Sequence, residues 1–542
     1  MKKKYSIGVP IIFLSITLVT IIIINLFFSQ HIIDSDMSSE LILARVLKRE
    51  HAWLSLDWFY STEIRIISFA QIASLFFHFT TDYSLVRTLT NLVFYVGLFT
   101  SFWYFMRSFL FSKTEILWGS VFLFLPVSLD WMEIMVIGSF YSIYMITMFL
   151  VLGSMERIRN PEIFMKNGKQ RRFYLFHFTI IGIMMFLFGL VGIRGAITLL
   201  IPLIVVFTYQ YRTLLLTEKK NRGIRCGILI SFFGFLAGYL YNKLVLATTY
   251  HFQSFDNAKK TINFTLQSVI GQLSQFVQSI LKLFGFREDI QINTFTGLIS
   301  LGSAVVAAIV IFVFIDIKKS KKLSDHEPCL FLWHMIVITF GIYIIIFSLT
   351  DFLMDARYMF QMYILMIPLF LLYCRGNRKN TILVLGVSAF LAVSAITLCS
   401  VSMTQNANEE ISEVSDFLRE NDYAFGYATF WNANIVTELT DGRVQVSSII
   451  LMNQENEKWL KPEKYRNPRY KSNKKRFVIF TKDEITENDF LVGGLAFLPL
   501  IYENNTYAVY ELPKGAVLFP AWEKLSETGE PITSSGAEMP VS

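Results

Sequence analysis

Two carboxylates stand close together in a polar stretch, HIIDSDMSSE at 31–40, that follows a long apolar run near the start of the chain. If this stretch is extended, Asp34 and Asp36 point to the same side, because alternate side chains of an extended chain share a face. Such a pair can share a cation, or the charge of one carboxylate can make the other a better base. The alternative is structural, since Asp36 or Ser38 can cap the amphipathic helix expected at 40–48.

A second polar cluster lies later in the same loop, where WLSLDWFYSTEIR spans 53–65. Trp and Tyr are common at membrane surfaces, and Glu63 with Arg65 can form a plain ion pair, so a structural role is open. Aromatic rings beside carboxylates also suit carbohydrate, because rings stack on the apolar faces of sugars while carboxylates accept hydrogen bonds from hydroxyl groups. We therefore predict that Tyr60, Glu63 and Arg65 bind substrate.

Three further polar sites interrupt long apolar runs and supply Glu133, Arg194, and the neighbours Arg357 and Tyr358. A charge at membrane depth is costly and therefore indicates a functional site, although a long Arg side chain can also reach water from a short hairpin. A guanidinium group can hold a phosphate through two parallel hydrogen bonds. We predict substrate binding for all four residues, with the alternative that Arg357 pairs with Asp355.

The composition of the whole chain indicates that these residues are positioned by membrane-spanning helices. Of the 542 residues, 54% are hydrophobic and 17% are charged, and the mean hydropathy is +0.48. Soluble domains carry about 25% charged residues, so this chain has too few to cover a soluble surface. Four Cys without metal-ligand spacing exclude a disulfide framework. The net charge of +7 does not indicate nucleic-acid binding, because the basic residues lie in short loops between apolar runs.

Apolar runs of bilayer length predict about 11 transmembrane helices. The first is long enough to be an uncleaved helix rather than a signal peptide. The predicted spans are 7–28, 84–106, 116–129, 138–154, 173–192, 196–210, 226–247, 293–315, 329–349, 357–373 and 381–400.

The distribution of Lys and Arg predicts the orientation of these spans. The predicted inner loops, at 1–6, 107–115, 155–172, 211–225, 316–327 and 374–380, are rich in Lys and Arg. The outer hairpins near 130, 194 and 351 hold one basic residue or none. The positive-inside rule therefore predicts a multi-pass protein of the plasma membrane with a cytoplasmic N-terminus, and it places 29–83, 248–292 and the tail outside.

The tail from 401 to 542 is more polar, and its pattern alternates between helix and strand. A helix is expected at 409–419, strands at 425–430, 444–451 and 476–481, and a hairpin at 498–512. We thus predict an α-helical polytopic membrane protein with two domains. A transmembrane domain at 1–400 includes the first outer loop at 29–83, and 401–542 forms a small extracytoplasmic α/β domain.

These features together resemble the GT-C superfamily of integral-membrane glycosyltransferases, which use polyprenyl-phosphate-linked sugars. The basic start, the uncleaved first helix, the acidic first outer loop and the many spans carry the resemblance, together with 31–40 and 58–65. The chain also resembles bacterial multi-span proteins associated with this superfamily. Arg357 and Tyr358 are similar to an Arg-Tyr pair often found there before a late span. Two departures are Ser35, which separates acidic residues that are adjacent in protein mannosyltransferases and aminoarabinose transferases, and a tail that lacks the Trp-Trp-Asp motif of oligosaccharyltransferases.

The resemblance implies transfer of a sugar from a polyprenyl-phosphate donor to a glycan, lipid or protein acceptor outside the membrane, as in cell-envelope polysaccharide biosynthesis. Asp34 would be the catalytic base or a metal ligand, with Asp36 as its partner. Only in the second case would a cofactor be present, a divalent cation such as Mg or Mn. Arg194 and Arg357 would hold the lipid phosphate. No P-loop for a soluble nucleotide sugar occurs.

Two alternatives stay open, a transporter or flippase of lipid-linked saccharides and a non-catalytic polysaccharide-assembly protein. Transporters typically carry ionisable residues at mid-span, with related halves and broken helices. In this chain the acidic residues gather in the predicted outer loops, and the sequence has no internal repeat.

Overall fold

The computed structural model describes residues 7–61, 64–165, 170–210, 222–252, 266–288, 290–350 and 354–519. The chain forms two compact units. The first, which we call the membrane unit, comprises Met1–Ser29, Thr62–Phe76 and Ser84–Gln405. The second, the tail unit, comprises Gln30–Ser61, Phe77–Tyr83 and Asn406–Ser542. Most of the first loop, which contains Asp34 and Asp36, therefore belongs to the same unit as the tail.

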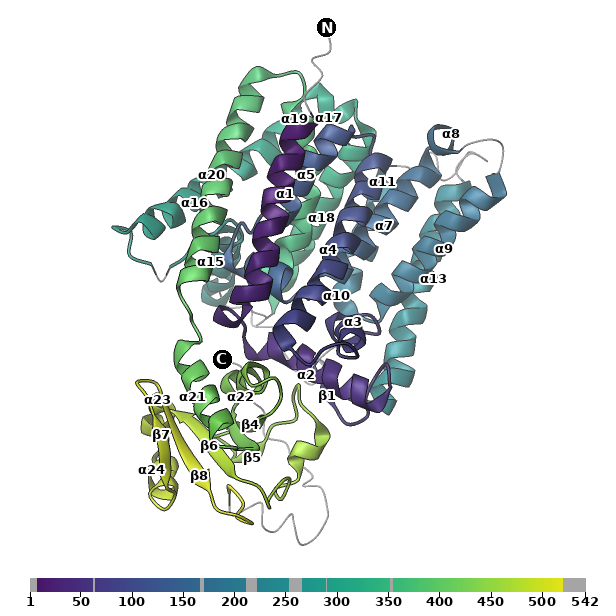
Figure 1. Cartoon of the computed structure of the whole chain (residues 1–542). Helices are drawn as coiled ribbons and strands as arrows, with labels where there is room; N and C mark the ends of the chain where they lie inside the picture. The colour runs from purple at the N-terminus through teal and green to yellow at the C-terminus, as the bar shows by residue number, and fades with distance from the viewer. Residues whose placement is uncertain are drawn as a thin grey trace. The chain divides into compact units, whose positions relative to one another are not determined.

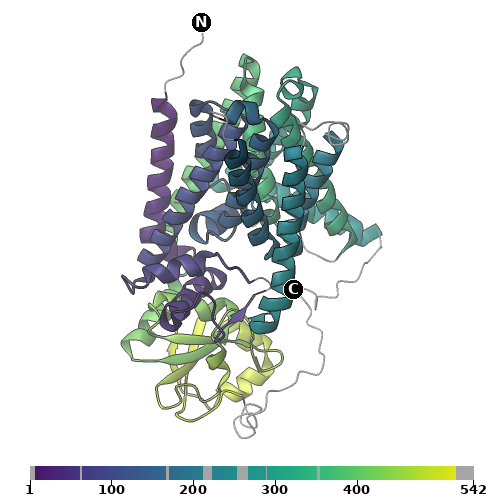
Figure 2. The same ribbon diagram turned by 90° about the vertical axis from the view of Figure 1, so that its right-hand side faces the viewer.

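The membrane unit consists of long helices that run roughly side by side in both views (Figure 1, Figure 2). Their apolar side chains face lipid or one another, and their internal hydrogen bonds satisfy the backbone where water is absent. The main helices are α1 (Gly8–Ile23), α4 (Tyr83–Ser108), α5 (Lys113–Phe124), α7 (Ser142–Arg159), α9 (Gln170–Gly189), α11 (Ile201–Gln210), α13 (Arg222–Tyr241), α16 (Phe295–Asp316), α18 (Glu327–Leu349), α19 (Phe360–Cys374) and α20 (Arg378–Thr404).

The predicted number of spans exceeds the number that the structure supports. The described residues contain nine helices long and apolar enough to cross a membrane, or ten if one bent pair counts as a span. That pair is α5 followed by Leu129–Ile137, and its two halves are bent by 101°. The predicted span at 138–154 forms α7, which is helical but ends in the charged residues Glu156, Arg157 and Arg159. The chain is thus a multi-pass helical protein whose third and fourth apolar runs are shorter or more polar than expected.

The bend after α5 follows from its sequence. Leu125 adopts an extended conformation before Pro126, because a residue that precedes proline is disfavoured in a helix. Ser128 then caps a new helical segment, accepting a hydrogen bond from the backbone N–H of Trp131 at 3.2 Å. This turned segment comprises α6 (Leu129–Trp131) and the π-helical η3 (Met132–Ile137). It carries Glu133, one of the predicted site residues.

Glycines allow α9 and α13 to pack closely. A Cβ atom added at Gly189 would overlap the carbonyl oxygen of Phe235, and one at Gly238 would overlap that of Phe186. Small residues at a helix interface let two backbones approach in a membrane, where packing rather than the hydrophobic effect holds helices together.

The tail unit contains a six-stranded sheet with the order β5-β4-β3-β6-β8-β7. Strand β3 is parallel to both of its neighbours, whereas β8 is antiparallel to β6 and β7. The strands are β3 (Phe425–Thr429), β4 (Gln445–Ile450), β5 (Glu455–Asn456), β6 (Arg476–Thr481), β7 (Leu500–Glu503) and β8 (Tyr507–Leu512). The prediction of a small sheet in the tail is confirmed.

Both faces of this sheet are buried. In β6, Phe477 and Ile479 pack on one face, and the alternate residues Val478 and Phe480 pack on the other. The helices α21 (Glu409–Glu420) and α22 (Phe430–Leu439) belong to the same unit, and α22 contacts β4. A helix from the first loop, α2 (Ser35–Glu50), packs against α22. Because α2 directly follows Asp34, the tail positions the start of the acidic loop.

Candidate functional site

Asp34 caps the N-terminus of α2. Its backbone is extended, with φ −116° and ψ −179°, and its carboxylate accepts a hydrogen bond from the backbone N–H of Met37 at 2.7 Å. Asp36 lies in the first turn of the helix and is half-buried. The extended arrangement of the two carboxylates is therefore wrong, because the helix begins at Ser35 rather than at 40. The capping alternative is correct in kind, but the cap is Asp34 rather than Asp36 or Ser38.

The residues on both sides of Asp34 are held by the rest of the tail unit. The hydroxyl of Ser35 donates to the carbonyl of Phe430, and the amide of Asn434 donates to the carbonyl of Ser35 at 3.3 Å. The amide of Asn408 donates to the carbonyl of Ile33 at 2.8 Å. These bonds fix the backbone around a carboxylate at the N-terminus of a 16-residue helix, where the helix dipole favours negative charge.

The three predicted binding residues at 60–65 have different environments. Tyr60 is buried in the tail unit, and its hydroxyl accepts a hydrogen bond from the backbone N–H of Ser55 at 2.8 Å. Glu63 lies outside the described residues. Arg65 belongs to the membrane unit, where its guanidinium carbon lies 5.4 Å from the centre of the Tyr144 ring.

Arg194 lies between two tyrosine rings at the end of a short connection. It belongs to α10 (Ile193–Gly195), which follows Gly192 with φ of 80°, a conformation that glycine adopts readily. One guanidinium nitrogen, Nη1, donates to the hydroxyl of Tyr141 at 3.1 Å. The guanidinium carbon lies 5.7 Å from the centre of the Tyr141 ring and 5.4 Å from that of Tyr358. The guanidinium group is thus oriented before any ligand arrives.

Arg357 pairs with Asp355, as the alternative from the sequence allowed. The two side chains form an ion pair of 2.6 Å, and Asp355 also caps η9 (Ala356–Met359) by accepting from the backbone N–H of Arg357 at 2.9 Å. The hydroxyl of Tyr343 donates to the carbonyl of Tyr358 at 3.1 Å, which fixes η9 to α18. The Arg357 side chain is 44% exposed, so its pairing with Asp355 contributes little stability and can be exchanged for another anion.

Glu133 is half-buried on the turned segment, and a buried polar network holds this segment in place. Backbone carbonyl groups at the end of the π-helical turn have no partner within the helix, so they need hydrogen-bond donors from elsewhere. The amide of Asn91 donates to the carbonyl of Ile137 at 2.9 Å and to Asn25 at 2.6 Å. Asn25 and Tyr95 both donate to the carbonyl of Val136. The position of Glu133 thus depends on side chains from two other parts of the bundle, α4 and the segment Ile24–Phe28.

Sequence reasoning missed Tyr141 and Tyr144, which connect the predicted arginines. The two rings pack edge to face, with their centres 5.4 Å apart. Arg194 contacts the first ring, and Arg65 lies over the second. The structure therefore brings Arg65, Arg194 and, through Arg194, Tyr358 into one aromatic cluster of the membrane unit. The signal in the sequence was a pair of tyrosines, three residues apart, at the start of α7.

The described residues contain no group of three His, Cys, Asp or Glu side chains with the geometry to hold a metal ion. Asp34 uses its carboxylate to cap α2, and Asp36 lies on the helix itself. The divalent cation suggested by the sequence therefore stays a prediction.

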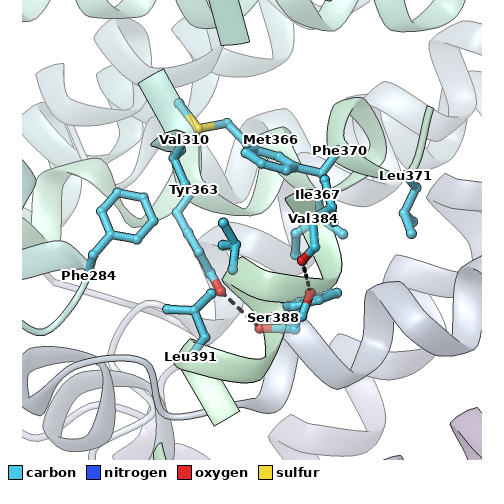
Figure 3. A pocket seen from close by; sticks show the side chains of 12 residues that line it. Phe284, Val310, Tyr363, Met366, Ile367, Phe370, Leu371, Val384, Ser388 and Leu391 are labelled. Carbon is cyan, nitrogen blue, oxygen red and sulfur yellow. Dashed lines mark hydrogen bonds between the residues drawn. The ribbon is translucent and has the colours of Figure 1, made fainter. Parts of the chain in front are cut away.

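An apolar cavity of about 50 Å³ lies among α16, α19 and α20 (Figure 3). Phe284, Val310 and Leu391 line it, and the hydroxyl of Tyr363 donates to the carbonyl of Phe122 at 3.3 Å. The cavity is too small for more than a few atoms, so we attribute it to imperfect helix packing.

No protein-family model matches the chain, and no curated protein matches it. Two solved structures do share its fold. One is a crystal structure of ArnT from Cupriavidus metallidurans bound to undecaprenyl phosphate, with a TM-score of 0.53, 11% identity, and coverage of 94% of this chain and 98% of the other. The second is the same protein in the apo state, with a TM-score of 0.53, 11% identity, and coverage of 93% and 98%. The predicted multi-span helical fold with a small sheet in the tail is thus confirmed, and it is the fold of these ArnT structures.

Proposed function

We propose that this protein is a membrane glycosyltransferase that moves a sugar from a polyprenyl-phosphate donor to a glycan, lipid or protein acceptor on the outer face of the plasma membrane. The observation that carries the proposal is Arg194, held between Tyr141 and Tyr358 in a helical membrane unit. The shared fold supports it, because the similar ArnT structure contains undecaprenyl phosphate.

Arg194 is the residue that we assign to the donor phosphate. Its guanidinium can bind two phosphate oxygens at once. The hydrogen bond to Tyr141 and the two flanking rings orient the guanidinium without a ligand. Such preorganised groups favour the charge that the phosphate gains as it leaves. Arg357 supplies a second cation when it exchanges Asp355 for the phosphate.

Asp34 is the base in this mechanism. Its carboxylate removes the proton from an acceptor hydroxyl, whose oxygen attacks the anomeric carbon of the donor sugar. The bond between that carbon and the phosphate oxygen breaks, and polyprenyl phosphate leaves with the bonding electrons. The negative charge of Asp36 makes Asp34 a better base. We assign Tyr60, Glu63, Arg65, Glu133 and Tyr358 to orientation of the sugar or the acceptor.

A transporter is the second candidate, and the bend of 101° after α5 favours it. Broken helices in transporters expose backbone carbonyls that bind ions or substrate. Here the carbonyls of Val136 and Ile137 accept hydrogen bonds from Asn25, Tyr95 and Asn91. A segment whose carbonyls are already bound is better suited to hold a fixed site than to bind a transported ion.

The decisive experiment supplies the purified protein with a panel of polyprenyl-phosphate sugars and crude envelope lipids as acceptor. A glycosyltransferase releases free polyprenyl phosphate, and the Asp34→Asn variant releases far less. The same donors in sealed liposomes test the transporter, since a flippase moves the intact donor across the bilayer without cleaving it. Movement without release would reject the proposed function.

A further inference from the structure

A polar cavity of about 290 Å³ lies in the membrane unit beside the amphipathic helix α15 (Leu266–Leu283). The apolar side chains of this helix at 266, 270, 273 and 277 are exposed. Its polar side chains Gln275, Gln278, Ser279 and Lys282 line the cavity. At 100° per residue these two sets fall on opposite faces. An exposed apolar face opposite a polar one is typical of a helix that lies in the membrane interface.

The other wall of the cavity consists of Asp130 and residues 354–356. Asp130 comes from the turned segment after α5, and Asp355 caps η9. The hydroxyl of Ser279 donates to the carbonyl of Met354 at 3.0 Å, so α15 is fixed to this wall. The cavity is therefore part of the folded membrane unit and not a gap beside a loose helix.

The charges that line the cavity fit an uncharged ligand. The carboxylates of Asp130 and Asp355 are balanced by Lys282 and by Arg357, which is paired with Asp355. Two carboxylates disfavour a phosphate, and a lysine disfavours a cation. The amides of Gln275 and Gln278 can each donate and accept, which suits hydroxyl groups. None of the described lining residues is aromatic, so hydrogen bonds rather than stacking would select the ligand.

The size and the position of the cavity limit the ligand further. A cavity of about 300 Å³ is at the small end of ligand sites, which suits one sugar ring. Because the apolar face of α15 is turned towards lipid, the cavity lies where a lipid head group would enter. The helix η9 also connects the cavity to Arg194, because Asp355 and Ala356 line the cavity while Tyr358 lies against the guanidinium.

We propose that this cavity binds an uncharged, hydroxylated sugar ring carried on a membrane lipid. The sugar ring can belong to the glycolipid acceptor or to the donor, and the assignment of either source rests on the proposed function. The prediction that the cavity binds such a ring does not rest on the proposed function.

Direct binding is measured on the full-length protein in nanodiscs by saturation-transfer NMR with methyl glucoside, methyl mannoside and methyl galactoside as probes. The test variant is Gln275→Met with Gln278→Met, which keeps side-chain length but removes both amides. The control is Gln267→Met, an exposed glutamine of the same helix that does not line the cavity. Loss of two hydrogen bonds should weaken binding by about 10-fold or more, with the control unchanged. Equal binding by all three proteins, or no binding of any glycoside by the unaltered protein, overturns the proposal.

Kinetics then identify the source of the ring. A rise of about 10-fold in acceptor KM alone, for the double variant, assigns the cavity to the acceptor, and the same rise in donor KM assigns it to the donor. Unchanged values for both substrates overturn the proposal. If no donor is cleaved by any form of the protein, the proposed function fails while the binding result stands, so the two failures are distinguishable.

Discussion

The hydroxyl of Tyr141 accepts a hydrogen bond from Arg194 at 3.1 Å, and the ring of the same tyrosine lies beside the guanidinium group. Tyr141 immediately precedes α7, and Arg194 precedes α11. The arginine is thus oriented by an element that is distant in sequence. A lysine in its place would keep the charge but lose the planar group that two tyrosine rings flank.

This relationship predicts how Arg194 variants behave. Arg194→Lys should raise donor KM and lower turnover, because the lost interaction is stronger in the transition state than in the ground state. We expect kcat/KM for the donor to fall by about 100-fold, as when one stabilising donor is removed. Tyr141→Phe is the milder control, since it removes a hydrogen bond but keeps the ring. Thermal unfolding in detergent accompanies the kinetics. A well-folded Arg194→Ala protein with unchanged donor kinetics would exclude a phosphate-binding role.

The orientation of the protein can be tested with single cysteines in a background where the four native Cys are replaced. Asn473 is exposed in the tail unit, and Lys379 is exposed at the start of α20. If the positive-inside rule holds, Asn473→Cys reacts with an impermeant thiol reagent on intact cells, whereas Lys379→Cys reacts only after lysis. The reverse pattern would place the tail in the cytoplasm and remove the outward-facing site.

Much of the fold could be predicted because its signals are local. The length of an apolar run predicts a span by itself, and the strand predicted at 476–481 forms there as β6. The third and fourth runs differ from full spans for reasons that are also local. Pro126 interrupts the third run, and three charged residues end the helix that contains the fourth.

The site was less predictable because it depends on long-range packing. The start of α2 at Ser35 requires contacts with α22 in the tail, which no pattern within 31–40 reveals. The cluster of Arg65, Arg194 and Tyr358 likewise requires α7 to place Tyr141 and Tyr144 between them. The residue types indicated which side chains belong to the candidate site, but only the tertiary structure shows which of them are in contact.

The network around the turned segment should be essential for its position. Asn91→Leu removes the partner of Asn25 and one of two donors to the carbonyl of Ile137, the other being Arg87 at 3.4 Å. Buried hydrogen bonds between membrane helices contribute about 0.6–2 kcal/mol each, so we expect a lower unfolding temperature and weaker activity together. Thr100→Leu is a matched control on the same helix, because Thr100 bonds only to its own helix backbone in the described structure. An active, stable Asn91→Leu protein would show that the hydrogen bonds of Asn91 are not needed to hold the segment.

Lys461 should make the stability of the tail unit depend on pH. Burial lowers the pKa of its ammonium to about 7, whereas the pKa of a lysine in the unfolded chain is about 10.4. Between these values the unfolded chain binds more protons, so the free energy of unfolding rises with pH and falls as the pH drops towards 7. The slope is at most about 1.4 kcal/mol per pH unit.

Hydrogen exchange of the β4 amides, corrected for intrinsic rates, measures this slope in the whole protein. Lys461→Met should flatten it, although the variant also leaves Ser447 and Asn456 without the Nζ donor of Lys461 and is less stable overall. The same pH slope in both proteins would assign it to other groups.

Asp34 serves two purposes in our proposal, as a helix cap and as a base, and two variants separate them. Asn caps helices about as well as Asp, so Asp34→Asn should fold normally. If Asp34 is the base, the turnover of this variant falls by at least about 100-fold. Asp34→Ala should lose the same activity and, in addition, about 0.5–2 kcal/mol of stability with the cap. The control is Asp57→Asn, whose carboxylate pairs with Lys464 at 2.9 Å elsewhere in the tail unit and should leave turnover unchanged. Full turnover in Asp34→Asn, with a stability loss confined to Asp34→Ala, would show that Asp34 is a cap and nothing more.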